Sequence, residues 1–100
     1  LLLPYSTHRR YFLLWQAAMF ALLGQVDQMR DALAQADELP LCERCGNGAC
    51  CDSVLFKALV GLIQGDVVTC CELVRLGRKK WPGSLGFACL EQELKRQGEL

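Results

Sequence analysis

Cysteine is the residue type in this chain best suited to chemistry, and the chain holds seven of them. Cys42 and Cys45 are separated by two residues, and Cys50 and Cys51 follow the glycine-containing stretch 46–48. Thiolates at this spacing in a loop can converge on a zinc ion, so these four cysteines are the candidate metal ligands. The second close ligand pair that a zinc finger requires is missing. We therefore expect unligated thiols and no cofactor, with zinc and a disulfide within the loop as the alternatives.

The other cysteines and the single histidine do not form a catalytic arrangement. Cys70, Cys71 and Cys89 have apolar neighbours in the sequence, and cysteine is among the residue types most often buried, so we expect core packing. A nucleophilic cysteine needs a base nearby, but His8 lies in a different part of the chain beside two arginines. The sequence therefore predicts no enzymatic activity.

Charge and composition restrict the classes of partner. Eleven lysines and arginines balance eleven aspartates and glutamates, which removes the electrostatic attraction on which nucleic-acid binding depends. Apolar residues make up 52% of the chain, enough for a core without disulfide bonds, so we expect a reducing intracellular compartment, the cytoplasm or nucleus. The apolar run 11–23 is shorter than the roughly 20 residues of a membrane span, and no span is predicted.

Glycine and proline divide the chain into helical segments. The run 11–23 is rich in leucine, alanine and methionine and ends at Gly24, and apolar residues then recur at the three- and four-residue steps of an amphipathic helix. Pro40 ends that second helix, and Asp52 or Ser53 is the expected cap of the third. The predicted helices cover residues 11–23, 25–38, 54–64, 67–80 with Asp66 as its cap, and 84–97.

Two helix pairs repeat the same order of features, which is an apolar helix, a glycine and an amphipathic helix. The stretch 17–29 resembles a tetratricopeptide repeat, and so does the stretch 58–70. In that family small residues lie where the two helices cross, and a glycine lies at the reversal between them. The matching positions here are Ala17, Ala58, Gly24, Gly65, Ala36 and Gly77, with Pro82 in the place of the closing proline.

The resemblance implies an all-α fold of two antiparallel helical hairpins and a C-terminal capping helix, in a right-handed stack similar to tetratricopeptide repeats. The two glycines lie 41 residues apart, and the excess over the family's repeat length falls in the cysteine-rich loop. We expect one domain, 1–100, divided into repeat one at about 10–41, the loop at 42–52, repeat two at about 53–82 and the capping helix at 84–97.

The same resemblance implies a protein-binding scaffold. The family's clamp for peptide carboxylates uses Lys, Arg and Asn on the inner face of the first helices, whereas this chain has apolar residues there, which favours an apolar groove. We expect a noncatalytic protein–protein interaction module that receives a helix or extended segment of a partner, or a neighbouring region of a larger parent chain. A metal-binding or redox-responsive module is the alternative. The expected groove residues are Tyr11, Leu14, Trp15, Ala18, Leu22, Leu55, Leu59 and Leu62.

Overall fold

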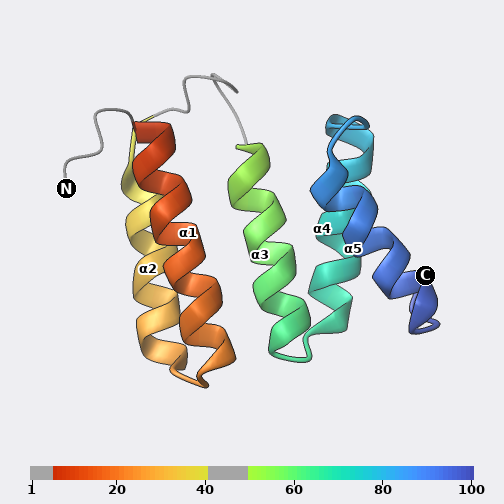
Figure 1. Ribbon diagram of the computed structural model, residues 1–100, viewed down its shortest axis with the longest axis horizontal. Coiled ribbons are helices and arrows are strands. Elements are labelled where there is room, and N and C mark those ends of the chain that lie inside the picture. The colour runs from red at the N-terminus through yellow and green to blue at the C-terminus, as the bar shows by residue number, and fades with distance from the viewer. Residues whose placement is uncertain (1–5, 41–49) are drawn as a thin grey trace.

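The computed structural model describes residues 6–40 and 50–100, and five helices make up its regular structure (Figure 1). Within these residues there is no strand, so the predicted all-α class is confirmed. The helices are α1 (Ser6–Leu22), α2 (Val26–Glu38), α3 (Cys51–Ile63), α4 (Val67–Lys80) and α5 (Leu85–Arg96).

Glycines make the tight reversals within two helical hairpins, α1 with α2 and α3 with α4. Gly24 has φ of +75°, a left-handed conformation that glycine adopts without steric cost. The Gly24 amide donates to the Ala21 carbonyl at 3.1 Å, and the Gln25 amide donates to the Phe20 carbonyl at 2.9 Å. This pair of bonds is a Schellman motif, which satisfies carbonyls that the helix end leaves without partners. The turn at Gly65 has the same two bonds and φ of +82°.

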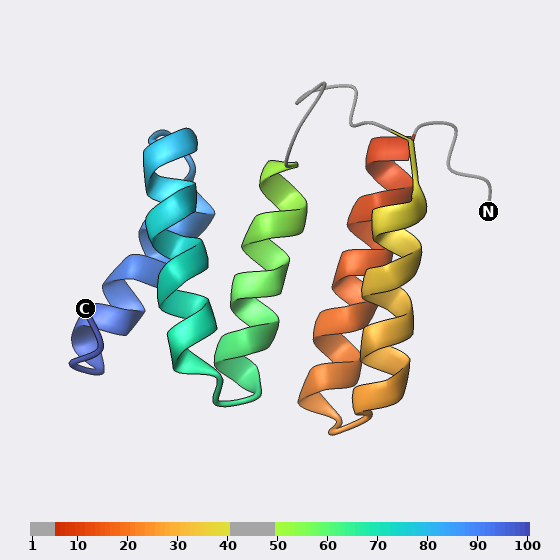
Figure 2. The same ribbon diagram turned by 180° about the vertical axis from the view of Figure 1, so that it is seen from behind.

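The helices form two layers. Figure 1 shows α1, α3 and α5 in front, and Figure 2 shows α2 and α4 in front when the molecule is turned around. The small residues predicted at the crossing positions are buried between the layers, since Ala17, Ala36 and Ala58 are fully buried and Gly77 is also buried. Small side chains at such positions let two helix axes approach closely.

The C-terminal helix closes one end of the stack by packing mainly on α4. Phe87 and Leu94 of α5 are fully buried in a core that includes Val74 of α4. Gly77 makes room for the ring of Phe87, because a Cβ atom at Gly77 would lie 2.3 Å from its Cε1 atom. The same ring stacks on Trp81 with 5.9 Å between centroids, so both Gly77 and Trp81 limit where the ring can lie.

Two helices begin earlier than expected. α1 begins at Ser6 rather than near residue 11, and its early turns are anchored by Arg10, whose guanidinium donates to the carbonyls of Leu39 and Pro40 at the end of α2. α3 begins at Cys51, so the expectation that Asp52 or Ser53 caps it is wrong, and Cys50 is the residue that precedes its first turn. In both cases packing against other helices extended a segment beyond the periodic apolar pattern.

Candidate functional site

The cysteine-rich segment is described only at its C-terminal end. Cys50 and Cys51 lie at the start of α3 and are half-buried, while Cys42 and Cys45 lie outside the described residues. Among residues 6–40 and 50–100, no group of three or more His, Cys, Asp or Glu side chains is placed to hold a metal ion. The four-cysteine zinc set therefore stays a prediction.

The other three cysteines have contrasting environments. Cys70 is fully buried and Cys71 nearly so, in the core between α3, α4 and α5. Burial raises the pKa of the Cys70 thiol, and the neighbouring Cys71 and Asp66 raise it further, which makes this thiol a poor nucleophile. The expectation that Cys89 packs in the core is wrong, because α5 turns Phe87, Leu90 and Leu94 inward and leaves Cys89 exposed.

The main candidate site is an exposed apolar surface on α1 and the turn after it, here called the α1 face. When its residues are projected down the helix axis at 100° per residue, they lie within an arc of about 120°. The sequence from 11 to 23 contains no charged residue, so the α1 face is uncharged over its whole length. Its six residues, each with 45–68% of its surface exposed, are Tyr11, Phe12, Trp15, Met19, Leu22 and Leu23.

The residues expected to line a groove are only partly available to a partner. Tyr11, Trp15 and Leu22 are exposed and belong to the α1 face. Leu14 and Ala18 are 0% and 2% exposed, so they are packing residues and cannot contact a partner. They share a buried cluster with Ala36 of α2 and Phe56 of α3. The three leucines expected on α3 are half-buried against the core, namely Leu55, Leu59 and Leu62.

Three members of the α1 face were not among the expected groove residues. They are Phe12, Met19 and Leu23, which are 55%, 56% and 68% exposed. A helical projection of the run 11–23 would have grouped them with Trp15 on one arc. That projection alone could not show whether this arc or the opposite one is buried, because almost the whole run is apolar.

Aromatic contacts hold one edge of the α1 face in place against α3. The ring of Phe56 contacts those of Trp15 and Tyr11 edge to face, with centroid distances of 5.1 and 5.7 Å. Trp15 and Tyr11 also contact each other, with centroids 6.2 Å apart. Such contacts restrict the rotamers of both exposed rings, so less side-chain entropy is lost when a partner covers their free sides.

Three of the six residues of the α1 face occupy helix positions through which α3 packs on the first hairpin. When Gly24 and Gly65 are aligned, Trp15, Met19 and Leu22 correspond to Phe56, Val60 and Ile63. Those three residues of α3 pack against α1 and α2. α1 therefore turns outward the set of positions that α3 uses for helix stacking. This equivalence indicates that the α1 face has the spacing to receive a helix.

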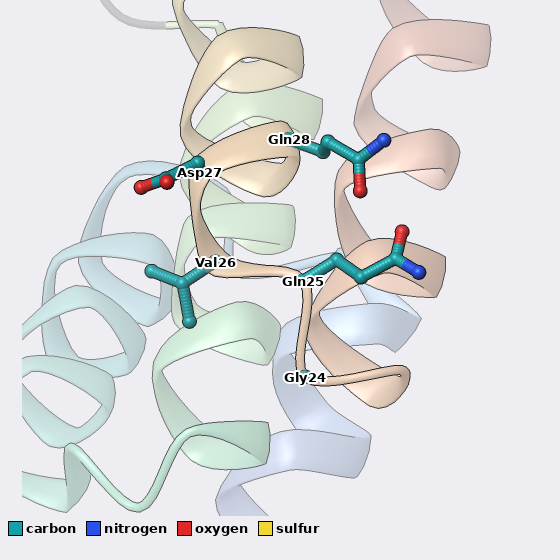
Figure 3. A pocket seen from close by; sticks show the side chains of 5 residues that line it. All are labelled: Gly24, Gln25, Val26, Asp27 and Gln28. Atoms are coloured by element: carbon teal, nitrogen blue, oxygen red, sulfur yellow. The ribbon is translucent and has the colours of Figure 1, made fainter.

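Two surface hollows lack polar side chains that could act together on one ligand. One of about 500 Å³ lies at the start of α2, lined by residues 24–28. Figure 3 shows that the amides of Gln25 and Gln28 point to one side of this segment and the side chains of Val26 and Asp27 to the other. Because these polar groups diverge, the hollow presents no common binding point to a ligand.

The second hollow, of about 510 Å³, lies on the outer surface of α5 between Leu85 and Arg96. Its two charged groups pair with each other, since Arg96 donates to the Glu93 carboxylate. The same carboxylate accepts a second hydrogen bond from Gln97 at 2.7 Å. These hydrogen bonds lower the pKa of Glu93, which therefore stays ionised and is unsuited to act as a general acid. The α1 face remains the stronger candidate.

None of the helices in residues 6–40 and 50–100 combines the length and the apolar character that crossing a membrane requires. No protein-family model, curated protein or solved structure matches the chain.

Proposed function

We propose that this chain is a noncatalytic protein–protein interaction module, built as a stack similar to tetratricopeptide repeats, which binds a partner helix or extended segment. The observation that carries the proposal is the α1 face, with six large apolar side chains adjacent on one arc and no charge among them. Soluble proteins rarely leave contiguous apolar patches of this kind uncovered, and such patches mark interaction sites.

The composition of the α1 face supports a binding role. Tyrosine and tryptophan are the residue types that most often dominate interface energies, and both are present with one side packed and the other exposed. α3 lies in the same layer as α1 (Figure 1), and no charged side chain interrupts the α1 face. A partner segment lying along α1 would therefore bury a continuous apolar strip.

Among the two kinds of partner segment, the spacing favours a helix. Phe12, Trp15, Met19 and Leu22 follow one another at intervals of three, four and three residues. These intervals are those of the a and d positions in a helix that packs along a second helix. An extended segment would instead meet side chains at a period of two, which the α1 face does not match.

Site-specific photocrosslinking in cells that express the chain tests this proposal. A benzoylphenylalanine at position 19, in place of the exposed Met19, should give a discrete crosslinked protein product after irradiation. The matched control is the same group at Val68, which is 70% exposed on α4 and lies away from the α1 face. Crosslinking from position 19 that does not exceed crosslinking from position 68 would contradict the proposal.

A further inference from the structure

We infer that the α1 face is covered by α1 of a second copy of this chain, packed antiparallel about a two-fold axis. The inference rests on the proposed function, since it names the partner for the same surface. A second copy fits the symmetry of the exposed residues along α1, the charge of Arg9 beside them, and the polar groups at the opposite end of the stack.

The exposed residues are arranged symmetrically about Ala17. An antiparallel two-fold dimer centred there would bring each residue opposite its mirror position on the second copy, because a two-fold interface must be self-complementary. Each pair of mirror positions joins an aromatic to an aliphatic side chain. The pairs are Tyr11 with Leu23, Phe12 with Leu22, and Trp15 with Met19.

This pairing makes the antiparallel orientation better packed than the parallel one. In the antiparallel dimer every large ring meets a smaller, flexible side chain, and the sulfur of Met19 meets the Trp15 ring. A parallel dimer would place three bulky aromatic residues against their own copies at one end and smaller aliphatic residues together at the other. Uneven side-chain volumes of that kind pack two straight helices poorly.

Charge supports the same orientation. Arg9 is exposed just beyond the aromatic end of the α1 face. In the antiparallel dimer it lies beside the C-terminal end of the second copy's α1, where a cation interacts favourably with the helix dipole. In the parallel dimer the two Arg9 side chains would lie next to each other and repel.

The opposite end of the stack is a poor alternative partner for α1. A head-to-tail assembly would press the α1 face against the outer surface of α5. Beside the apolar Leu85, Ala88 and Cys89, that surface carries Gln92, Glu93 and Arg96, and the ion pair between Glu93 and Arg96 would lose its solvent contact. A two-fold dimer avoids this cost and closes the assembly at two copies.

The available area predicts a reversible dimer. A standard stable interface covers about 800 Å² on each partner. The three rings of the α1 face, each about half exposed, offer roughly 300 Å² between them, and Met19, Leu22 and Leu23 add the area of three aliphatic side chains. The interface is therefore at the small end of the range, and we expect dissociation at micromolar concentrations.

Sedimentation equilibrium of the purified chain, from low to high micromolar concentration, measures this association. We expect a monomer–dimer equilibrium. Met19→Glu should weaken it at least tenfold, since the substitution places two unpaired carboxylates in each dimer. Val68→Glu, an equally polar change at another exposed apolar position, should leave the dissociation constant unchanged. Far-UV circular dichroism checks that both variants keep the helical content of the wild type.

Crosslinking in the purified protein tests the orientation. A benzoylphenylalanine at position 19, in an equal mixture of ¹⁴N- and ¹⁵N-labelled copies, should give mixed-isotope products attached near Trp15 of the other copy. Attachment near position 19 would overturn the antiparallel arrangement. A chain that stays monomeric at all concentrations would overturn the second copy as the partner. The proposed function would still stand if the position-19 crosslink in cells joins another protein. If the crosslink in cells were also absent, both the dimer and the proposed function would be contradicted.

Discussion

At the scale of single residues, burial decides what each cysteine can do. Cys70 and Cys89 are chemically identical in the unfolded chain, but one is fully enclosed between helices and the other lies on an outer surface. Removing a thiolate from water is unfavourable, so the folded protein holds the proton of Cys70 more tightly than the unfolded chain does. Burial of Cys70 therefore costs the least free energy at pH values where its thiol is protonated.

This proton linkage gives a measurable pH dependence. The pKa of Cys70 is raised in the folded state from its usual value of 9.0, so its contribution to stability is full below pH 9 and is lost as the pH rises through the folded pKa. The difference in unfolding free energy between wild type and Cys70→Ala, from urea titrations at several pH values, should shrink above pH 9. A difference that stays constant up to pH 10.5 would contradict this.

At the scale of helices, close contacts that only glycine permits determine how α5 joins the stack. The ring of Phe87 occupies the space that a side chain at Gly77 would need, and its stacking on Trp81 limits how far it can move aside. Gly86 of α5 also approaches a neighbour, Leu55, but there the contact is with the flexible end of a half-buried leucine. The two glycines therefore differ in how well their surroundings can adjust.

Gly77→Ala should destabilise the protein by up to about 2 kcal/mol, because overpacking costs about 1–3 kcal/mol and the higher helix propensity of alanine offsets roughly 1 kcal/mol of it. Urea unfolding followed by far-UV circular dichroism measures the change. Gly86→Ala is the matched control, since the Leu55 side chain can rotate away and the loss should be smaller. Equal stability losses for the two variants would show that the Phe87 ring is not held as described.

At the scale of the whole molecule, the two hairpins and α5 share one connected core. Leu59 of α3 packs against both the cluster around Phe87 and the cluster around Leu14. Leu33 of α2 in turn packs against the cluster around Leu14 and the one around Met29. No part of the described stack can unfold without exposing apolar surface of its neighbour.

We therefore expect two-state unfolding of the whole chain. Trp15 and Trp81 lie in different hairpins, so single-tryptophan variants, Trp81→Phe and Trp15→Phe, report separately on them. For each variant, the urea midpoint from tryptophan fluorescence should coincide with that from far-UV circular dichroism. If fluorescence and circular dichroism gave separate midpoints, the hairpins would be independent units.

The candidate site was predictable from the sequence only in part. The apolar excess on the first helix led us to expect Tyr11, Trp15 and Leu22 in a groove, and all three are exposed. Leu14 and Ala18 were expected beside them but are buried. All five lie in one nearly continuous apolar run, in which periodicity cannot distinguish the inner from the outer side.

What the sequence determined by itself was local: an all-helical chain, reversals at Gly24 and Gly65, and small residues where helices cross. These features follow from helix propensity and from glycine's freedom to take positive φ, which depend on few neighbouring residues. The tertiary structure decided which side of α1 is left open, that Cys89 faces outward, and that α5 packs on α4. Those outcomes depend on the positions of helices distant in sequence, since a side chain is buried only where another element covers it.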